Sequence, residues 1–123
     1  MTTRGDLGAF GERVAAHRLE AAGMAILARN VRVPGGEIDL LCRDGADTVC
    51  VEVRTRRSAP GTAAESVSAT KRARMWRAAF AYADRAGIDP ANLRVDLVVI
   101  DLGPGGEVAH TAHLRAIELP DDT

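Results

Sequence analysis

The stretch of residues 35–57 constrains the fold of this 123-residue chain more than any other. Two apolar, β-branched runs lie on either side of the tetrapeptide D-G-A-D (44–47), a pattern typical of a tight turn between antiparallel strands. Because side chains alternate between the two faces of a strand, Val49, Val51 and Val53 are expected to form one apolar face. The stretch is therefore predicted to be a β-hairpin that buries one side.

The opposite face of this hairpin carries acids. A turn centred on the bond after Gly45 places Asp39 directly opposite Glu52, and a turn centred on the bond before Gly45 pairs Asp39 with Cys50 and leaves Glu52 diagonal to it. Either register gathers the two carboxylates, whereas a half-step slip would mix Val51 into the polar face. The first strand is expected to point Ile38, Leu40 and Cys42 to one face and Glu37, Asp39 and Leu41 to the other.

Two carboxylates this close repel each other, and one keeps its proton unless a cation shares the site. A divalent ion resolves the repulsion. Mg²⁺ or Mn²⁺ suits such oxygen ligands, because these ions take one or two protein carboxylates and complete their coordination with water or substrate phosphate. The alternative is an exposed hairpin face on which Glu52 forms a weak surface ion pair with Arg54 or Arg43. The spacing by itself leaves both interpretations open.

The order of these residues resembles known nuclease motifs. Asp39, twelve intervening residues and then Glu52-Val53-Arg54 resemble the PD-(D/E)xK motif of the restriction-endonuclease-like fold. Four motifs together resemble the YraN-type family of small bacterial proteins: G-x-x-G-E (8–12), G-E-I-D-L-L (36–41), V-E-V-R (51–54) and R-V-D-L-V-V-I (94–100). The resemblance covers roughly residues 5–101 of the chain.

This resemblance implies a restriction-endonuclease-like fold related to that of archaeal Holliday junction resolvases. It also implies a metal-dependent nuclease that hydrolyses DNA phosphodiester bonds, with branched or single-stranded structures as candidate substrates. In that interpretation Asp39, Glu52 and Glu12, with the carbonyl of Val53, hold one or two Mg²⁺ or Mn²⁺ ions. The residues around Glu12 also allow it to be a helix-flank acid paired with Arg13 or another arginine.

Arg54 departs from the family pattern, which has lysine at this position. Arginine stays protonated, so Arg54 is expected to bind the scissile phosphate and stabilise developing charge but not to shuttle a proton. Only one of the sixteen basic residues is lysine, so an exchange of Lys for Arg fits the composition of the whole chain. That single lysine, Lys71, is a candidate to assist Arg54, and its alternative is a solvated helix charge.

A local basic patch has to support any nucleic-acid binding, because the net charge is −1 and the pI is near 6.3. Aromatic residues make up only 3% of the chain, which disfavours base stacking and favours recognition of the backbone and shape. The predicted patch combines Arg54 with Arg56, Arg57, Lys71, Arg72, Arg74 and Arg77. The alternative is a solvated helix face.

The periodicity of the rest of the chain predicts a single α/β domain over residues 1–123, with residues 1–5 and 120–123 frayed. The expected order is a helix (6–23), a strand (24–34), the hairpin, a loop (58–64), a helix (66–87), a buried strand (93–102) and an edge strand through Leu119. These elements are expected to form a mixed central β-sheet flanked by helices.

Capping residues and core positions follow from the same patterns. Asp6 and either Ser66 or Ser68 are expected to cap the two helices at their N-termini, and Gly23 and Gly87 to end them. Trp76 and Phe80 are expected in the core. Asp96 is interpreted as an acid behind the site or as the exposed end of its strand, and is not placed in the site. His110 and His113 are weak evidence for a metal.

The remaining features bear on the compartment and on partners. Cys42 and Cys50 are predicted to point to opposite faces of the hairpin and to stay free thiols. No apolar run approaches the length of a membrane span, so the chain is expected to be cytoplasmic. Analogy with the resolvases allows a homodimer. The alternative function is a catalytically impaired module on the nuclease fold that binds nucleic acid or another protein.

Overall fold

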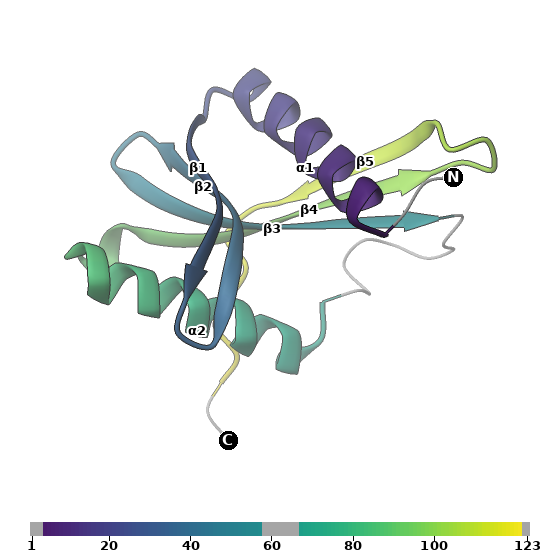
Figure 1. Cartoon of the computed structure of the whole chain (residues 1–123). Helices are drawn as coiled ribbons and strands as arrows, with labels where there is room; N and C mark the ends of the chain where they lie inside the picture. Colours follow the sequence, from purple (N-terminus) through teal and green to yellow (C-terminus); the bar gives the residue numbers. More distant parts are fainter. Residues whose placement is uncertain (1–3, 58–66, 122–123) are drawn as a thin grey trace.

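Strand β3 (Asp47–Arg57) lies at the centre of a five-stranded mixed sheet in this computed structural model, which describes residues 4–57 and 67–121. The strand order is β1-β2-β3-β4-β5, and only β3 and β4 pair in parallel. One helix covers each face of the sheet, as Figure 1 shows. The remaining elements are α1 (Arg4–Ala21), β1 (Ala25–Val33), β2 (Gly36–Asp44), α2 (Ala69–Ala86), η2 (Pro90–Asn92), β4 (Leu93–Leu102) and β5 (Val108–Leu114). The prediction of an α/β architecture with a mixed sheet is confirmed.

The hairpin of β2 and β3 has the first of the two predicted registers. Asp44 pairs with Asp47 and Leu40 with Val51, so the turn is centred after Gly45, which has a φ of 61°. The β2–β3 pairing ends at Leu40 and Val51, whereas β3 continues to pair with β4 as far as Arg57. The sheet therefore forks beyond this pair, with β2 and β3 diverging (Figure 1).

Two apolar clusters fill the space between the sheet and the helices. The α1 cluster contains Ala15, Ala16, Leu19, Met24, Leu40, Cys42, Val49, Val51, Val98, Ile100 and Leu102. The α2 cluster contains Val33, Ile38, Leu41, Cys50, Met75, Ala78, Ala79, Ala83, Leu93, Val95, Leu97, Val99 and Ile117. The two cysteines are buried, free and in opposite clusters, as predicted, and burial raises the pKa of each thiol to about 12.

The expected alternation of side chains along β2 is wrong at Ile38. It packs in the α2 cluster with Leu41, three residues along, instead of sharing a face with Leu40 and Cys42. A strict two-residue repeat would place Ile38 on the α1 side. The alternation therefore breaks between Ile38 and Leu40, at the level where β2 leaves β3.

The same break occurs in the neighbouring strand. Ala28 and Val31 of β1 are three residues apart, and both pack against the α2 cluster. Between them lies Asn30, whose φ of 51° is in the left-handed region. Asn30 faces Asp39 across the pair of strands, because the flanking register joins Val31 to Ile38 and Arg29 to Leu40. The two strands thus lose their regular alternation together.

The helix ends agree with the sequence except at the start of α1. This helix begins at Arg4, so Asp6 lies inside it and is not its N-cap, because the helical hydrogen bonding extends two residues further than expected. Gly23 follows the end of α1 with a φ of 92°. Ser68 caps α2, and Gly87 ends it with a φ of 70°. Neither described helix is long and apolar enough to span a bilayer.

Phe80 is not a core residue, contrary to expectation. It is 40% exposed and contacts Trp76, with 5.2 Å between the ring centroids. Trp76 is partly buried against the α2 cluster, and its indole N–H donates to the carbonyl of Ile117 at 2.9 Å. The face of α2 that meets the sheet consists of Met75 and small alanines. Phe80 therefore lies outside this face and points toward solvent.

Asp96 is fully buried, which rules out the interpretation of this residue as the exposed end of its strand. Its carboxylate accepts two hydrogen bonds from Arg94 at 3.0 Å each and one from the Ala116 N–H at 3.0 Å, and it lies 2.8 Å from His113 Nε2. Burial by itself would raise the pKa of Asp96, but the bonds to His113, Arg94 and Ala116 hold it at about 2. The network ties β4 to β5 and to the segment after it.

Gly11 lets α1 lie close to β3. A Cβ atom at this buried position would collide with Thr55 Oγ1, and Ile100 Cδ1 is only 3.7 Å away, whereas a Cβ at Gly8 would meet nothing within 4 Å. The two glycines of the G-x-x-G-E motif therefore differ in role. Gly11 sets the approach of α1 to the sheet, and Glu12 follows it directly.

Replacing these two glycines with alanine should have opposite effects on the free energy of unfolding. Gly11→Ala is expected to lower it by about 1–3 kcal/mol, because Thr55 is β-branched and adjusts poorly. Gly8→Ala is the matched control in the same helix, and should raise stability by up to about 1 kcal/mol through helix propensity. Urea denaturation of both variants tests this, and equal effects would contradict the proposed close packing.

Removal of the Asp96 carboxylate should destabilise the fold strongly. Asp96→Ala leaves His113 buried without its partner and leaves Arg94 with only Asp44 and Asp47, and it is expected to cost about 3–5 kcal/mol in urea denaturation. Asp84→Ala, at an exposed position on α2, should stay within about 0.5 kcal/mol of the wild type. A loss below about 1 kcal/mol for Asp96→Ala would show that the network contributes little.

Candidate functional site

Asp39 occupies the point where the sheet forks. Its Oδ2 accepts a hydrogen bond from the backbone N–H of Val53 at 2.8 Å. This contact lies just beyond the last β2–β3 pair, which joins Leu40 to Val51. The carboxylate thus takes the place of a carbonyl in the interrupted ladder. This contact holds the side chain of Asp39 against β3 and beside Glu52.

Glu52 lies on the adjoining strand, and 28% of its side chain is exposed. Its Oε1 is 3.7 Å from Nη2 of Arg74, which reaches it from α2. Burial raises the pKa of Glu52, and the positive charges of Arg74 and then Arg54 oppose that rise. Helix α2 and strand β3 therefore bring two arginines to this carboxylate.

Glu12 reaches the same region from α1. Burial raises its pKa, a hydrogen bond from Asn30 lowers it, and the charge of Glu37 raises it again. With the Asn30 amide oriented to donate, its nitrogen lies 3.2 Å from Glu12 Oε1 and 3.1 Å from Glu37 Oε1. Three elements, α1, β1 and β2, therefore meet at this side of the fork.

The acids act on one another most strongly at Asp39. Burial raises the pKa of Asp39 to about 6; the charges of Glu52, Glu12 and Glu37 add to that rise, and the Val53 N–H opposes it. The structure thus brings the three predicted acids, Asp39, Glu52 and Glu12, into one electrostatic neighbourhood. It adds Glu37, which the sequence interpretation left out of the site.

A complete metal cage is not formed by these side chains alone. Within residues 4–57 and 67–121, no group of three or more Asp, Glu, His or Cys side chains is arranged closely enough to hold a metal ion. The oxygen ligands at the fork still match the chemistry of Mg²⁺, which needs only one or two protein carboxylates and takes its other ligands from water and phosphate. Any metal here would bind with an incomplete set of protein ligands.

The predicted basic residues do not form one continuous patch. Arg54 and Arg74 lie near Glu52, and Arg57 is exposed at the end of β3. Arg56 forms a bidentate ion pair with Asp101 at 2.8 and 3.2 Å and is only 14% exposed, so Asp101 offsets most of its charge.

On α2, the basic side chains divide between different sides of the helix. Arg74 and Arg77 are exposed, and Lys71 is half-exposed in the first turn. Arg72 instead lines a surface hollow with Leu114 and Ile117, on the side of the helix next to the C-terminal segment. The predicted set of seven thus separates into residues near the fork and residues placed elsewhere.

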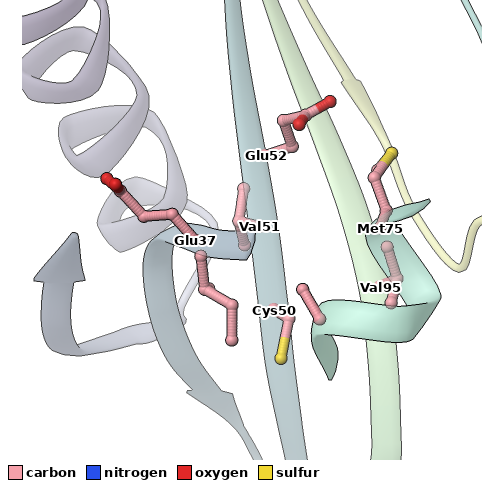
Figure 2. A pocket seen from close by; sticks show the side chains of 8 residues that line it. Glu37, Cys50, Val51, Glu52, Met75 and Val95 are labelled. Atoms are coloured by element: carbon pink, nitrogen blue, oxygen red, sulfur yellow. The ribbon is translucent and has the colours of Figure 1, made fainter. Parts of the chain in front are cut away.

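A small cavity of about 20 Å³ lies between the hairpin and α2 (Figure 2). Apolar side chains, among them Ile38, Cys50 and Met75, line it, with Glu37 and Glu52 also contributing. The carboxylates of these two glutamates point away from each other in Figure 2, with that of Glu37 on the side of α1. A space of this size holds about one water molecule, so a polymeric substrate would have to bind across the outer surface.

Asn30 and Glu37 are the residues of this region that the sequence interpretation did not identify. An asparagine within an apolar strand is a signal that could have found Asn30, because strands are depleted in asparagine. Glu37 lies in the same G-E-I-D-L-L motif as Asp39, but alternation by itself does not predict that it meets α1. Both assignments depend on where α1 lies.

The fold and the site together define the class of this protein: it is a small α/β domain with acids at a fork of its mixed sheet. The chain belongs to the uncharacterised protein family UPF0102, whose defining sequence pattern matches residues 11–100. A UPF0102 protein of Symbiobacterium thermophilum is 46% identical over 103 residues, covering 83% of this chain and 87% of the relative. A UPF0102 protein of Frankia alni is 44% identical over 116 residues, covering 94% and 96%. The names of these relatives give the family and no activity.

The raised pKa of Asp39 predicts a pH-dependent effect of neutralising it. The folded-state pKa of about 6 exceeds the ordinary 3.8, so the stability linked to protonated Asp39 is complete below pH 3.8 and is lost as the pH rises through 6. Without divalent ions, Asp39→Asn should therefore be more stable than the wild type at pH 7. We expect about 1–2 kcal/mol, allowing for partial exposure of the group.

Urea denaturation at pH 4 and pH 7 measures this difference, which should nearly vanish at pH 4. Asp84→Asn, an exposed acid on α2, is the control and should show little change at either pH. A variant that is less stable than the wild type at pH 7 would contradict the raised pKa.

Proposed function

We propose that this protein is a metal-dependent nuclease that hydrolyses DNA phosphodiester bonds, with branched or single-stranded structures as candidate substrates. We also propose that its fold is of the restriction-endonuclease-like type. The observation that carries the proposal is the fork at Asp39, where burial and the charges of Glu52, Glu12 and Glu37 raise the pKa of one carboxylate to about 6. Clustered acids that destabilise each other's charged forms are typical of sites that act on a cation or a proton.

The ligands proposed for the metal are Asp39, Glu52 and the carbonyl of Val53, with Glu12 as a further acid. Their oxygen atoms suit Mg²⁺ or Mn²⁺. When bound, the ion would lower the pKa of a water molecule and offset the negative charge on the phosphodiester. The role of the chain itself is to hold the carboxylates: the Val53 N–H orients Asp39 at 2.8 Å, and the close packing at Gly11 brings α1 and Glu12 to the fork.

Arg54 and Arg74 are the residues proposed to bind the scissile phosphate. Both lie close enough to Glu52 to lower its pKa. A guanidinium presents several N–H donors in a plane and binds phosphate oxygens in pairs. Because it stays protonated, Arg54 would stabilise charge without removing a proton from water. Lys71, in the first turn of the same helix as Arg74, is the candidate assistant.

The substrate is proposed to lie across the open side of the fork. The cavity there holds only about 20 Å³, which is too small for a nucleotide. Arg74 and Arg77 on α2 and Arg57 at the end of β3 are exposed, so they are available to contact backbone phosphates. Binding of this kind should weaken steeply as salt concentration rises.

One observation favours the second candidate, a nucleic-acid-binding module without useful catalysis. Arg74 already lies 3.7 Å from a carboxylate oxygen of Glu52, a proposed metal ligand, and Arg54 replaces the lysine of the family pattern. Arginines that neutralise Glu52 would compete with a cation for it. The repulsion among Asp39, Glu12 and Glu37 is the main difficulty for this candidate, because a pure binder of polyanions has no use for clustered acids.

Cleavage assays distinguish the two candidates. A labelled panel of duplex, single-stranded, flap and four-way-junction DNA should be cut in the presence of Mg²⁺ or Mn²⁺. Asp39→Asn and Glu52→Gln should each reduce the rate by at least about 100-fold, since each removes a charge from the proposed metal site. Glu20→Gln, at an exposed position on α1, should leave the rate unchanged.

If DNA cleavage survives both substitutions, catalysis does not take place at this site. No cutting by the wild type, together with salt-dependent DNA binding that Arg57→Ala and Arg77→Ala weaken, would favour the binding module. Arg54→Lys then tests the departure from the family pattern. If this variant cuts DNA and the wild type does not, the arginine at position 54 is the cause of the missing activity.

A further inference from the structure

Asn30 has an unusual backbone for a residue inside a strand. Its φ of 51° lies in the left-handed region, and the only other non-glycine residue with positive φ in the described part of the chain is Ala116. Asparagine tolerates this conformation better than most residues. Strained backbone of this kind persists only where the surrounding structure determines it, and it is frequent at functional sites.

The position of Asn30 in the sheet matches that of Asp39. The pairs Val31–Ile38 and Arg29–Leu40 flank it, so Asn30 and Asp39 face each other where both strands lose their alternation. The residue with left-handed backbone, Asn30, thus lies opposite Asp39 in the sheet.

The amide of Asn30 joins two carboxylates from different elements. With the amide oriented so that its nitrogen faces the two acids, its two N–H donors point to Glu12 Oε1 of α1 at 3.2 Å and to Glu37 Oε1 of β2 at 3.1 Å, and the opposite orientation would turn its oxygen toward these acceptors. No other hydrogen bond connects the side chain of Glu12 to the sheet within the described residues. Together with the charge of Arg29 on β1, this amide is therefore what orients the carboxylate of Glu12 relative to the sheet.

We propose that Asn30 is a positioning residue whose amide clamps Glu12 to Glu37 and so holds Glu12 beside Asp39, with Glu37 as the anchor of the clamp and not a metal ligand. This inference rests on the proposed function, because the clamp matters for activity only if Glu12 serves the metal site. The inference assigns different roles to Glu12 and Glu37.

The chemistry of an amide suits this task. It donates to two anions without carrying a charge, so it reduces their repulsion and does not compete with a metal as a lysine or arginine would. An aspartate at position 30 would add another negative charge to the cluster. Groups that orient metal ligands by hydrogen bonds typically contribute about 10–100-fold to metal affinity or activity.

The test is Mn²⁺ binding by the full-length protein, followed by electron paramagnetic resonance of the free ion. Asn30→Gly removes the amide and keeps a residue that adopts positive φ readily, so the backbone should be preserved. We expect the Kd for Mn²⁺ to rise about 10-fold. Asn92→Gly, the same change at an exposed position of η2, is the matched control and should leave the Kd within about 2-fold of the wild type.

A double-mutant comparison separates positioning from general loss of structure. On a Glu12→Gln background, Asn30→Gly should cost no more than about 2-fold further, because the residue that it positions has already lost its charge. Glu37→Gln retains an oxygen that accepts from the amide, so it should change the Kd by less than about 3-fold, whereas Asp39→Asn should abolish specific binding.

Three results would overturn the inference. Equal Kd values for Asn30→Gly and Asn92→Gly, with tight binding by the wild type that Asp39→Asn abolishes, would refute the clamp and leave the proposed function intact. A loss in Glu37→Gln as large as in Asp39→Asn would make Glu37 a ligand. Wild-type binding no tighter than that of Asp39→Asn would refute the metal site itself, and the clamp with it.

Discussion

The parallel pairing of β3 with β4 is the constraint on which the rest of the structure depends. Ten residue pairs, from Thr48–Leu93 to Arg57–Leu102, join the two strands. Parallel neighbours require a crossover connection, and α2 provides it on one face of the sheet. The hairpin partner β2 accompanies β3 only as far as Val51, so the second half of β3 keeps β4 as its neighbour while β2 turns away. The fork at which Asp39 and Glu52 lie half-buried is a direct result.

Two aspartates show how differently this fold treats buried acids. Asp96 is fully buried, but Arg94, His113 and the Ala116 N–H surround it, and its pKa is held at about 2. Burial raises the pKa of Asp39 to about 6, the charges of Glu52, Glu12 and Glu37 add to that rise, and the Val53 N–H is the one donor among the described residues that opposes it. The first acid stabilises the structure by its charge, whereas the second destabilises the structure when it ionises. A residue retained at such a cost is more readily explained by function than by stability.

The elements around the fork contribute unequally to the proposed site. Strands β2 and β3 supply Asp39 and Glu52 on a rigid backbone, whereas Glu12 arrives on a helix that is joined to the sheet only through side chains, such as Arg18, which donates to Thr111 of β5 at 2.8 Å within the described residues. Two features position it: Gly11 allows α1 to approach β3, and the amide of Asn30, with its nitrogen toward the acids, can bridge Glu12 to Glu37. The helix can therefore bring an acid to the site without supplying any part of the sheet.

Much of this protein was determined by its sequence alone, because the patterns involved are local. Turn chemistry and two-residue alternation predicted the hairpin and the proximity of Asp39 to Glu52, and capping signals predicted the ends of α2 at Gly87 and at one of two serines, of which Ser68 is the cap. Tertiary structure alone decided the break of alternation at Ile38, the burial of Asp96, the division of the arginines and the contact of Asn30 with Glu12. These features depend on which distant segments pack together, and the energies of burial, ion pairing and backbone strain that select them act between residues far apart in the chain.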